Sequence, residues 1–324
     1  MKKVERLALA GLLVAVGMAV AGYGGVEPVW FAGVELLLFG VGLVGVVGLS
    51  DETLAGLPWM PLLVMGLVVV QWLPWPRPLS VAPYETETHL LRLVAYLVAF
   101  YWAVLLAARE EGRARLAGGL VAVGTAAGLY GIAQYVSAHS LDYNATGPYV
   151  NRNHFAGLLE MLLPLALGWT LAQGRGARSS WREWWTRAEA QKGWLGLVAA
   201  VVIFSAIVFS RSRMGWLSTL FALLVMSLGM SWGASPRMSA AGPLAVVLAG
   251  AALFSLWVGV DPVVARFGQA FADPGRPPIW ADTGRLIREH PWLGTGWGTF
   301  PLAYPAVQTA HLGRRVSHAH NDYL

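Results

Sequence analysis

Apolar runs of membrane-spanning length follow one another through most of this sequence, and they constrain its fold more than any other feature. About 20 apolar residues in an α-helix cross a bilayer. Such windows fall near residues 7–22, 29–49, 53–73, 90–107, 116–136, 154–172, 194–209, 212–232 and 240–260. The runs are too long and too uniform for barrel strands, and only helices satisfy the backbone of such runs in lipid. The sequence therefore predicts an all-α, polytopic membrane helix bundle with about nine transmembrane helices.

Composition agrees with a membrane protein. Hydrophobic residues make up 56% of the chain and charged residues only 13%, whereas soluble domains carry about a quarter charged residues. Cysteine is absent, which excludes disulfides and thiolate sites. The basic start and first apolar run imitate a secretory signal, but eight more runs follow, so we expect an uncleaved first helix. The net charge of +5 lies mostly in short loops between spans, so it indicates orientation and no nucleic-acid partner.

Basic residues orient the chain in the membrane. With the N-terminus inside, the cytoplasmic segments hold 12 Lys and Arg, and the short outer segments hold 5. This bias follows the positive-inside rule. It predicts a multi-pass membrane protein with a cytoplasmic N-terminus. Residues 1–260 are then the helix bundle, and residues 261–324 are a partly helical loop segment on the outer, periplasmic face. The basic, aromatic loop 174–193 favours contact with membrane lipids.

Two arginines occupy a tight outer turn, residues 210–216, between the seventh and eighth spans. An arginine within a span costs about 2.5–3.5 kcal/mol on insertion scales, so Arg211 and Arg213 need an explanation. One is that they snorkel to lipid phosphates. The other is a bidentate clamp on a phosphate or pyrophosphate group, which suits the planar guanidinium.

Residues 151–157 form a second polar stretch, where the sixth span begins on the outer side. Asn151 there is expected to cap the helix, a contribution of about 1 kcal/mol. The same helix end offers unpaired N–H groups and a positive dipole to an anion. Arg152 and Asn153 are therefore candidate substrate-binding residues, and these two stretches are expected to converge with the outer segment that ends the sequence.

The outer segment contains a third polar region. Residues 280–288 have helical spacing, and the helix is expected to stop before Pro291, since the residue before a proline disfavours helix. The Gly-rich stretch 294–298 is weak evidence for nucleotide binding because no strand-turn-helix pattern surrounds it.

Residues 318–322, His-Ala-His-Asn-Asp, imitate the start of a binuclear metallohydrolase motif. The next residue is Tyr323 rather than His, so we expect no metal site. A neutral imidazole is the usual general base near neutral pH.

These stretches, in this order, resemble the O-antigen ligase and O-antigen polymerase superfamily of bacterial envelope glycosyltransferases. The matching residues are 147–157, 210–217, 279–280, 290–300 and 318–321, within roughly the second half of the chain. The resemblance implies an inverting, metal-independent enzyme without a cofactor. Its donor would be an undecaprenyl-pyrophosphate-linked glycan and its acceptor a lipid or glycan, at the outer face of the inner membrane.

The resemblance also implies residue roles. His320, followed by Asn321, matches the family's proposed general base better than His318 does. His318 or Asp322 would set the tautomer of that base, and we include His318 and Asn321 among the substrate-binding candidates.

The arginines of the family map onto four positions. Arg213 matches the arginine of the Ser-Arg-Gly motif, and Arg211 is its neighbour. Arg276 matches the arginine upstream of the Ile-Trp pair, with Arg285 as a less certain substitute. These side chains are expected to clamp the pyrophosphate.

Alternatives stay open at this point. A transporter of a small solute or anion would show broken helices in matching halves, and a non-catalytic scaffold would leave His320 replaceable. The family continues past its histidine into further loop and spans, whereas this sequence stops four residues after His320. We therefore expect a fragment or a truncated member, and the sequence does not separate ligase from polymerase.

Overall fold

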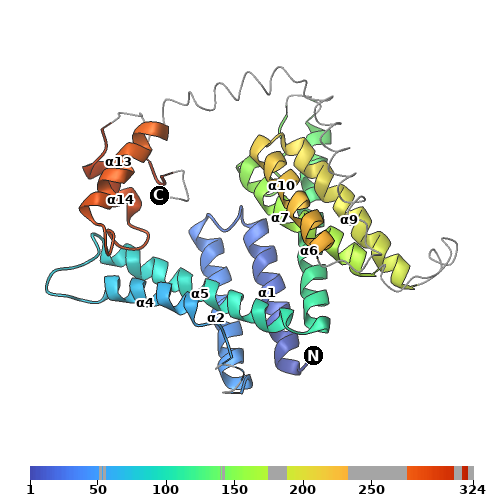
Figure 1. Ribbon diagram of the computed structural model, residues 1–324, viewed down its shortest axis with the longest axis horizontal. Coiled ribbons are helices and arrows are strands. Elements are labelled where there is room, and N and C mark those ends of the chain that lie inside the picture. Colours follow the sequence, from blue (N-terminus) through green and yellow to red (C-terminus); the bar gives the residue numbers. More distant parts are fainter. Residues whose placement is uncertain are drawn as a thin grey trace. The chain divides into compact units, whose positions relative to one another are not determined.

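The computed structural model describes residues 1–50, 53, 56–138, 140, 143–173, 188–232, 276–309 and 316–319. Helices dominate these segments, and no strand occurs among them. The helices of the first half are α1 (Lys3–Ala21), α2 (Pro28–Gly48), α4 (Met60–Trp72), α5 (Pro83–Ala107) and α6 (Glu110–Ser137) (Figure 1). Those of the second half are α7 (Arg152–Gln173), α9 (Ala188–Ser210), α10 (Arg213–Trp232), α13 (Arg276–Glu289), α14 (Phe300–Ala303) and the 3₁₀ helix η2 (Tyr304–Ala306).

Six of the described helices are long and apolar enough to cross a membrane, namely α1, α2, α5, α6, α7 and α9. α4 and α10 are shorter apolar helices at two further predicted spans. The ninth expected span, 240–260, lies outside the described residues, as does most of the basic loop 174–193. The expected class, a polytopic helical membrane protein, is confirmed.

Two helix boundaries can be compared with the sequence expectation. α5 begins at Pro83, ahead of the apolar window at 90, because proline favours the first turn of a helix. α13 ends at Glu289, directly before His290 and Pro291, as expected for a residue that precedes proline.

The chain divides into two compact units. The first unit consists of Met1–Gly48 and Trp102–Gly259, and the second of Leu49–Tyr101 and Val260–Leu324. The sequence-based division at residue 260 follows membrane spans rather than contacts and stays a prediction.

The first unit is built around α7, which packs against α6, α9 and α10 (Figure 1). Phe155 and Leu159 of α7 and Ile203 and Ile207 of α9 are fully buried in this core. Small residues bring α7 and α10 close together: a Cβ at Gly215 would lie 2.6 Å from the Cβ of Ala156. Such close approach is typical of membrane helices, whose association depends on packing rather than on the hydrophobic effect.

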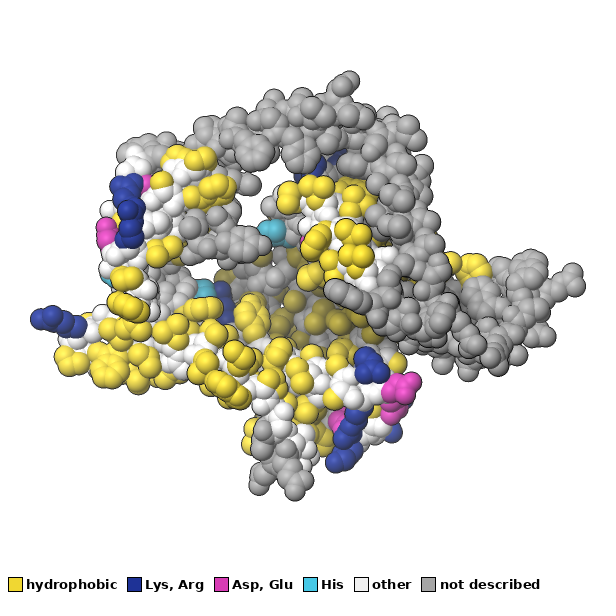
Figure 2. Space-filling model, in the orientation of Figure 1, with side chains coloured by type: hydrophobic (Ala, Val, Ile, Leu, Met, Phe, Trp, Pro, Cys, Tyr) yellow, Lys and Arg dark blue, Asp and Glu magenta, His cyan; other side chains and the backbone are white. Residues whose placement is uncertain are grey.

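The second unit combines α4 and the first part of α5 with α13, α14 and η2. Its small core joins Ile279 of α13, Tyr304 of η2 and Val316. Large apolar side chains are exposed along the described helices of both units, and yellow dominates the described surface in Figure 2. Such a surface is suited to lipid.

Candidate functional site

The two outer polar stretches of the first unit meet at the starts of α7 and α10. The hydroxyl of Ser212, just before α10, donates a hydrogen bond of 2.9 Å to Oδ1 of Asn153 on α7. The close contact between Gly215 and Ala156 lies one turn further along both helices. The part of the expected convergence that concerns residues 151–157 and 210–216 is therefore present in the structure, whereas the convergence with the outer segment stays a prediction.

The turn that precedes α10 is held by its serines. Ser212 caps α10, since its Oγ accepts a 3.2 Å hydrogen bond from the backbone N–H of Gly215. The Oγ of Ser210 accepts one of 3.2 Å from the N–H of Ser212. Arg211, between the two serines, has a φ of 53°, a left-handed conformation that is uncommon for a residue with a side chain. Arg213 is the first residue of α10, and its side chain is exposed.

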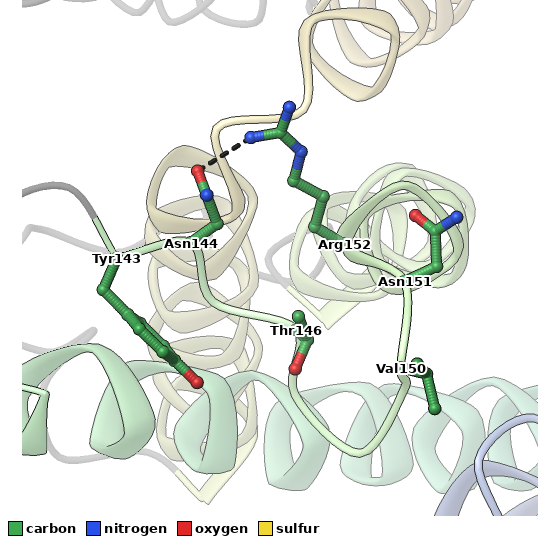
Figure 3. Close-up of a pocket in the computed structure, with 6 residues that line it drawn as sticks. All are labelled: Tyr143, Asn144, Thr146, Val150, Asn151 and Arg152. Atoms are coloured by element: carbon green, nitrogen blue, oxygen red, sulfur yellow. Dashed lines mark hydrogen bonds between the residues drawn. The ribbon is translucent and has the colours of Figure 1, made fainter.

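Arg152 and Asn151 organise the start of α7. The Oδ1 of Asn151 accepts a 2.8 Å hydrogen bond from the N–H of Asn153, which confirms the expected cap. Nη1 of Arg152 donates one of 2.8 Å to Oδ1 of Asn144, in the preceding loop (Figure 3). That loop is fixed to the end of α9, because the N–H of Ala145 donates to the carbonyl of Phe209 at 3.0 Å.

An open pocket of about 540 Å³ lies over this loop. Its lining includes Arg152, Asn144 and Asn151, together with Tyr143, Thr146 and Val150 (Figure 3). Hydroxyl, amide and guanidinium groups give the pocket many hydrogen-bonding positions. Asn144 was missed at the sequence level; the signal was a polar turn directly before the Asn-Arg-Asn stretch.

The geometry suits an anion. Two helix N-termini meet, and each presents backbone N–H groups and the positive end of its dipole. Arg152, Arg211 and Arg213 lie at or next to these helix starts. Guanidinium groups placed there bind phosphate or pyrophosphate by paired hydrogen bonds.

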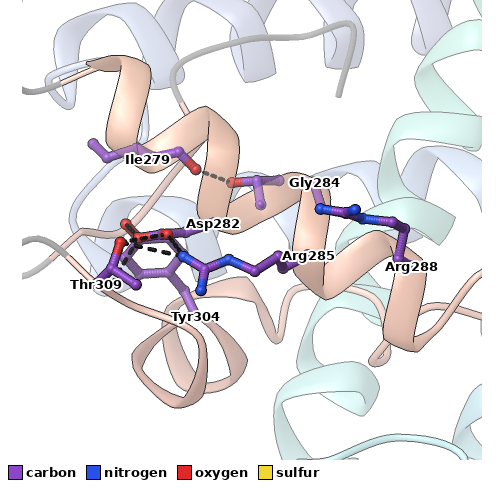
Figure 4. Close-up of polar contacts among 8 residues, drawn as sticks. Ile279, Asp282, Gly284, Arg285, Arg288, Tyr304 and Thr309 are labelled. Carbon is purple, nitrogen blue, oxygen red and sulfur yellow. Dashed lines mark hydrogen bonds and ion pairs between the residues drawn. The ribbon is translucent and has the colours of Figure 1, made fainter.

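In the second unit, a buried carboxylate organises the helix α13. Asp282 accepts hydrogen bonds from the Thr309 hydroxyl at 2.7 Å, the Thr309 N–H at 2.9 Å and the Tyr304 hydroxyl at 3.2 Å, and it pairs with Arg285 (Figure 4). Burial alone would raise the pKa of Asp282, but the hydrogen bonds from Thr309, Arg285 and Tyr304 outweigh it and lower the pKa. For Tyr304, burial and the neighbouring Asp282 charge raise the pKa of the hydroxyl.

Arg285 is thus committed to a structural ion pair. Its guanidinium also donates to the hydroxyl of Thr309 at 3.2 Å. Arg288, less than one turn further along, points away from Asp282 and donates to the carbonyl of Gly284 at 3.1 Å (Figure 4). Arg276, the arginine that the resemblance prefers, is the first residue of α13, but its side chain lies outside the described residues.

The stretch before His320 is attached to α13. The indole N–H of Trp280 donates a 3.0 Å hydrogen bond to the carbonyl of Ala319, and Val316 is buried in the small core of this unit. His318 is exposed, and its Nδ1 lies 2.8 Å from the hydroxyl of Ser317. His320 and Asn321 lie outside the described residues, as does the rest of the metal-like motif from His320 onward.

The Gly-rich loop 294–298 is a packing element. Gly296 and Gly298 have φ angles of 109° and 81°, and neither has room for a side chain. A Cβ at Gly296 would lie 2.4 Å from Oγ of Ser80, and one at Gly298 would lie 2.3 Å from Nδ1 of His89. The glycines therefore let this loop approach residues 80–89 closely, and this contact accounts for the spacing that imitates a nucleotide-binding motif.

Gln71 holds the same loop through two hydrogen bonds and was missed at the sequence level. Its Nε2 donates to the carbonyl of Leu293 at 2.6 Å, and its Oε1 accepts from the N–H of Trp297 at 3.0 Å. Gln71 is buried. The available signal was its position as a hydrogen-bonding side chain in the otherwise apolar helix α4.

Comparison with known proteins adds an independent observation. Residues 198–324 match the family model described as O-antigen ligase. The C-terminal part of this chain is thus similar to the O-antigen ligase family. An O-antigen ligase of Pseudomonas aeruginosa is 32% identical over 117 residues, which is 36% of this chain and 26% of that relative. The matched region thus spans about a quarter of the relative's length. No solved structure matches the chain.

The candidate site residues fall partly inside and partly outside the matched region. Arg211, Arg213, Arg276 and His320 lie inside the O-antigen ligase region, whereas Arg152 and Asn153 precede it. The hydrogen bond between Ser212 and Asn153 joins the start of α10, inside the matched region, to the start of α7, which precedes it.

Proposed function

We propose that this protein transfers a glycan from an undecaprenyl-pyrophosphate carrier to a lipid or glycan acceptor, at the outer face of the bacterial inner membrane. One observation carries the proposal: the arginine-bearing starts of α7 and α10 are locked together by Ser212 and Asn153. A site of this kind fits a pyrophosphate better than it fits the uncharged parts of a glycan, because its main resource is positive charge.

The proposed chemistry needs a stabilised leaving group. As the bond between the sugar and the pyrophosphate breaks, negative charge develops on the pyrophosphate oxygens. Arg213 and Arg211 are proposed to hold these oxygens, with Arg152 beside them and Arg276 completing the clamp. Charges already in place lower the barrier without solvent reorganisation, so the mechanism requires neither a metal nor a cofactor.

The acceptor hydroxyl needs a base, and we assign this role to His320. Attack on the face opposite the leaving group inverts the anomeric centre. Support comes from the attachment of the preceding residue, Ala319, to Trp280, because a base must be positioned to work. His318 is proposed to orient His320, and Asn321 to bind substrate. The N-terminus is placed in the cytoplasm and residues 261–324 outside.

The first test replaces His320 with alanine in the full-length protein. Loss of a positioned general base costs about 10²–10⁴ in rate, so transfer should fall at least about a hundredfold. Expression and thermal melting should stay nearly unchanged. The measurement is glycan transfer from lipid-linked donor in membranes with matched protein levels.

His318→Ala is the matched control, two residues away, and it should reduce transfer less. Treatment with EDTA should leave transfer intact. Wild-type transfer by His320→Ala would refute the catalytic assignment. Loss of transfer in EDTA with recovery in zinc would favour a metal-dependent mechanism.

A further inference from the structure

The turn that follows α13 exposes large apolar side chains. Trp292 is 92% exposed, and Leu293 and Trp297 are also exposed. The turn has few charges, since residues 291–298 read Pro-Trp-Leu-Gly-Thr-Gly-Trp-Gly. Tryptophan favours the boundary between lipid and water, where its ring meets apolar chains and its N–H meets polar groups.

The helix α4 presents a lipid-facing surface in the same unit. Its sequence, Met-Pro-Leu-Leu-Val-Met-Gly-Leu-Val-Val-Val-Gln-Trp, is apolar except for Gln71. Leu63, Val70 and Trp72 are among its exposed side chains. So continuous an apolar face, in a helix of a polytopic membrane protein, is suited to contact with lipid. Trp72, its last residue, and exposed Trp75 mark the end of this lipid-facing surface.

Gln71 joins these two surfaces. It is the penultimate residue of α4, and its side chain bonds both Leu293 and Trp297. The loop is therefore held at the end of α4, level with the edge of the lipid-facing surface. A second attachment, the 2.9 Å hydrogen bond from the N–H of Val81 to the carbonyl of Thr295, fixes the middle of the loop.

We propose that residues 291–297 are a membrane-surface anchor, in which Trp292 inserts into the lipid headgroup layer and Gln71 sets the position of the loop. The anchor binds lipid because its exposed side chains continue the lipid-facing surface of α4. It keeps α13, and with it the attached residues 316–319, at the membrane boundary. This interaction is separate from glycan transfer and does not depend on which residue is the base.

The experiment measures the depth of position 292 in the membrane. The chain contains no cysteine, so Trp292→Cys takes a single environment-sensitive fluorophore. The full-length protein is reconstituted in vesicles of phosphatidylethanolamine and phosphatidylglycerol that carry a nitroxide quencher on the lipid headgroup. The control is the same label at exposed Ala281 on α13. Quenching at position 292 should exceed that at 281 by about twofold or more.

A second set of variants tests the role of Gln71. In the labelled Trp292→Cys protein, Gln71→Ala should reduce quenching towards the level at position 281. Gln71→Glu keeps an acceptor for Trp297 but loses the donor to Leu293, so it should have an intermediate effect. A melting curve and helical circular dichroism check that each variant is folded.

Two glycines give a matched pair that leaves α4 unaltered. Gly296→Ala places a Cβ against Ser80 and should displace the loop, whereas Gly294 also has a positive φ, of 64°, but open space around it. Gly294→Ala should therefore keep most of the quenching. Equal quenching at positions 292 and 281 would overturn the anchor and would indicate water or a protein at this surface. Unchanged quenching in both Gln71→Ala and Gly296→Ala would overturn the positioning role.

Discussion

Arginines in the two units are held in opposite ways. In the second unit, Arg285 pairs with a buried carboxylate, Asp282, that Tyr304 and Thr309 also bind. In the first unit, Arg152 donates to the neutral amide of Asn144, and Arg213 is exposed at the start of α10. The difference shows that the position of an arginine in the sequence does not reveal its role. The group that binds the guanidinium does.

Charge balance explains why the difference matters. The positive charge of Arg285 is compensated by Asp282, so little remains for a ligand. Among the residues that the structure describes, no ion pair involves Arg152. Its charge is therefore better suited to meet an anion than the charge of Arg285.

Replacing Arg213 should reduce activity more than any other substitution considered. Arg213→Lys keeps the charge but loses the paired hydrogen bonds, so it should fail nearly as badly as Arg213→Ala, with transfer reduced about 10²-fold or more. Arg285→Lys should retain transfer within about threefold, because lysine still pairs with Asp282. The measurement for both variants is the rate of glycan transfer from the lipid-linked donor at equal expression levels. Full activity of Arg213→Lys would instead favour snorkelling to lipid phosphates.

The next effect concerns stability in the second unit. Asp282→Ala removes the acceptor of Tyr304 and Thr309 and strands Arg285, so it should destabilise this unit by about 3 kcal/mol. Glu289→Ala, at the exposed end of α13, should change stability by less than about 0.5 kcal/mol. Protease resistance of residues 276–319 and thermal melting report the difference. Equal behaviour of the two variants would show that the Asp282 cluster contributes little.

The lowered pKa of Asp282 also predicts that the stability of the second unit depends on pH. The pKa of Asp282 is lower in the folded protein than the ordinary 3.8, so its ionised form stabilises the fold. That stability is fully present above the unfolded-state pKa and is lost as the pH falls through the lowered folded-state pKa. Melting should thus weaken below about pH 4, and Asp282→Asn should flatten this part of the profile.

Ser212, at the start of α10, should give a smaller effect. Ser212→Ala removes a helix cap and the hydrogen bond to Asn153, so it should cost about 1–2 kcal/mol. Transfer should fall more than stability alone explains, because the Arg213 backbone loses its attachment to α7. Ser218→Ala, within α10, is the control. Normal transfer by Ser212→Ala would show that the contact between α7 and α10 is not needed for activity.

The sequence predicted the helical membrane class, the Asn151 cap, the end of α13 and the meeting of α7 with α10. These follow from local patterns: hydropathy reports spans, and capping residues and prolines report helix ends. It did not predict the start of α5, because the residues after Pro83 are polar and hydropathy misses them. The roles of Gln71 and Asp282 were also missed, since both depend on partners chosen by tertiary packing.

The hydrogen bond between Gln71 and Leu293 also bears on the order of events during synthesis of the chain. The two residues are 222 positions apart, so at synthesis rates of about 5–20 residues per second the partner follows roughly 10–45 s later. During that interval the amide of Gln71 needs water, because an unpaired amide in hydrocarbon is costly. The end of α4 must therefore stay in contact with water until residues 293–297 have been synthesised, and the docking of this loop then releases that water.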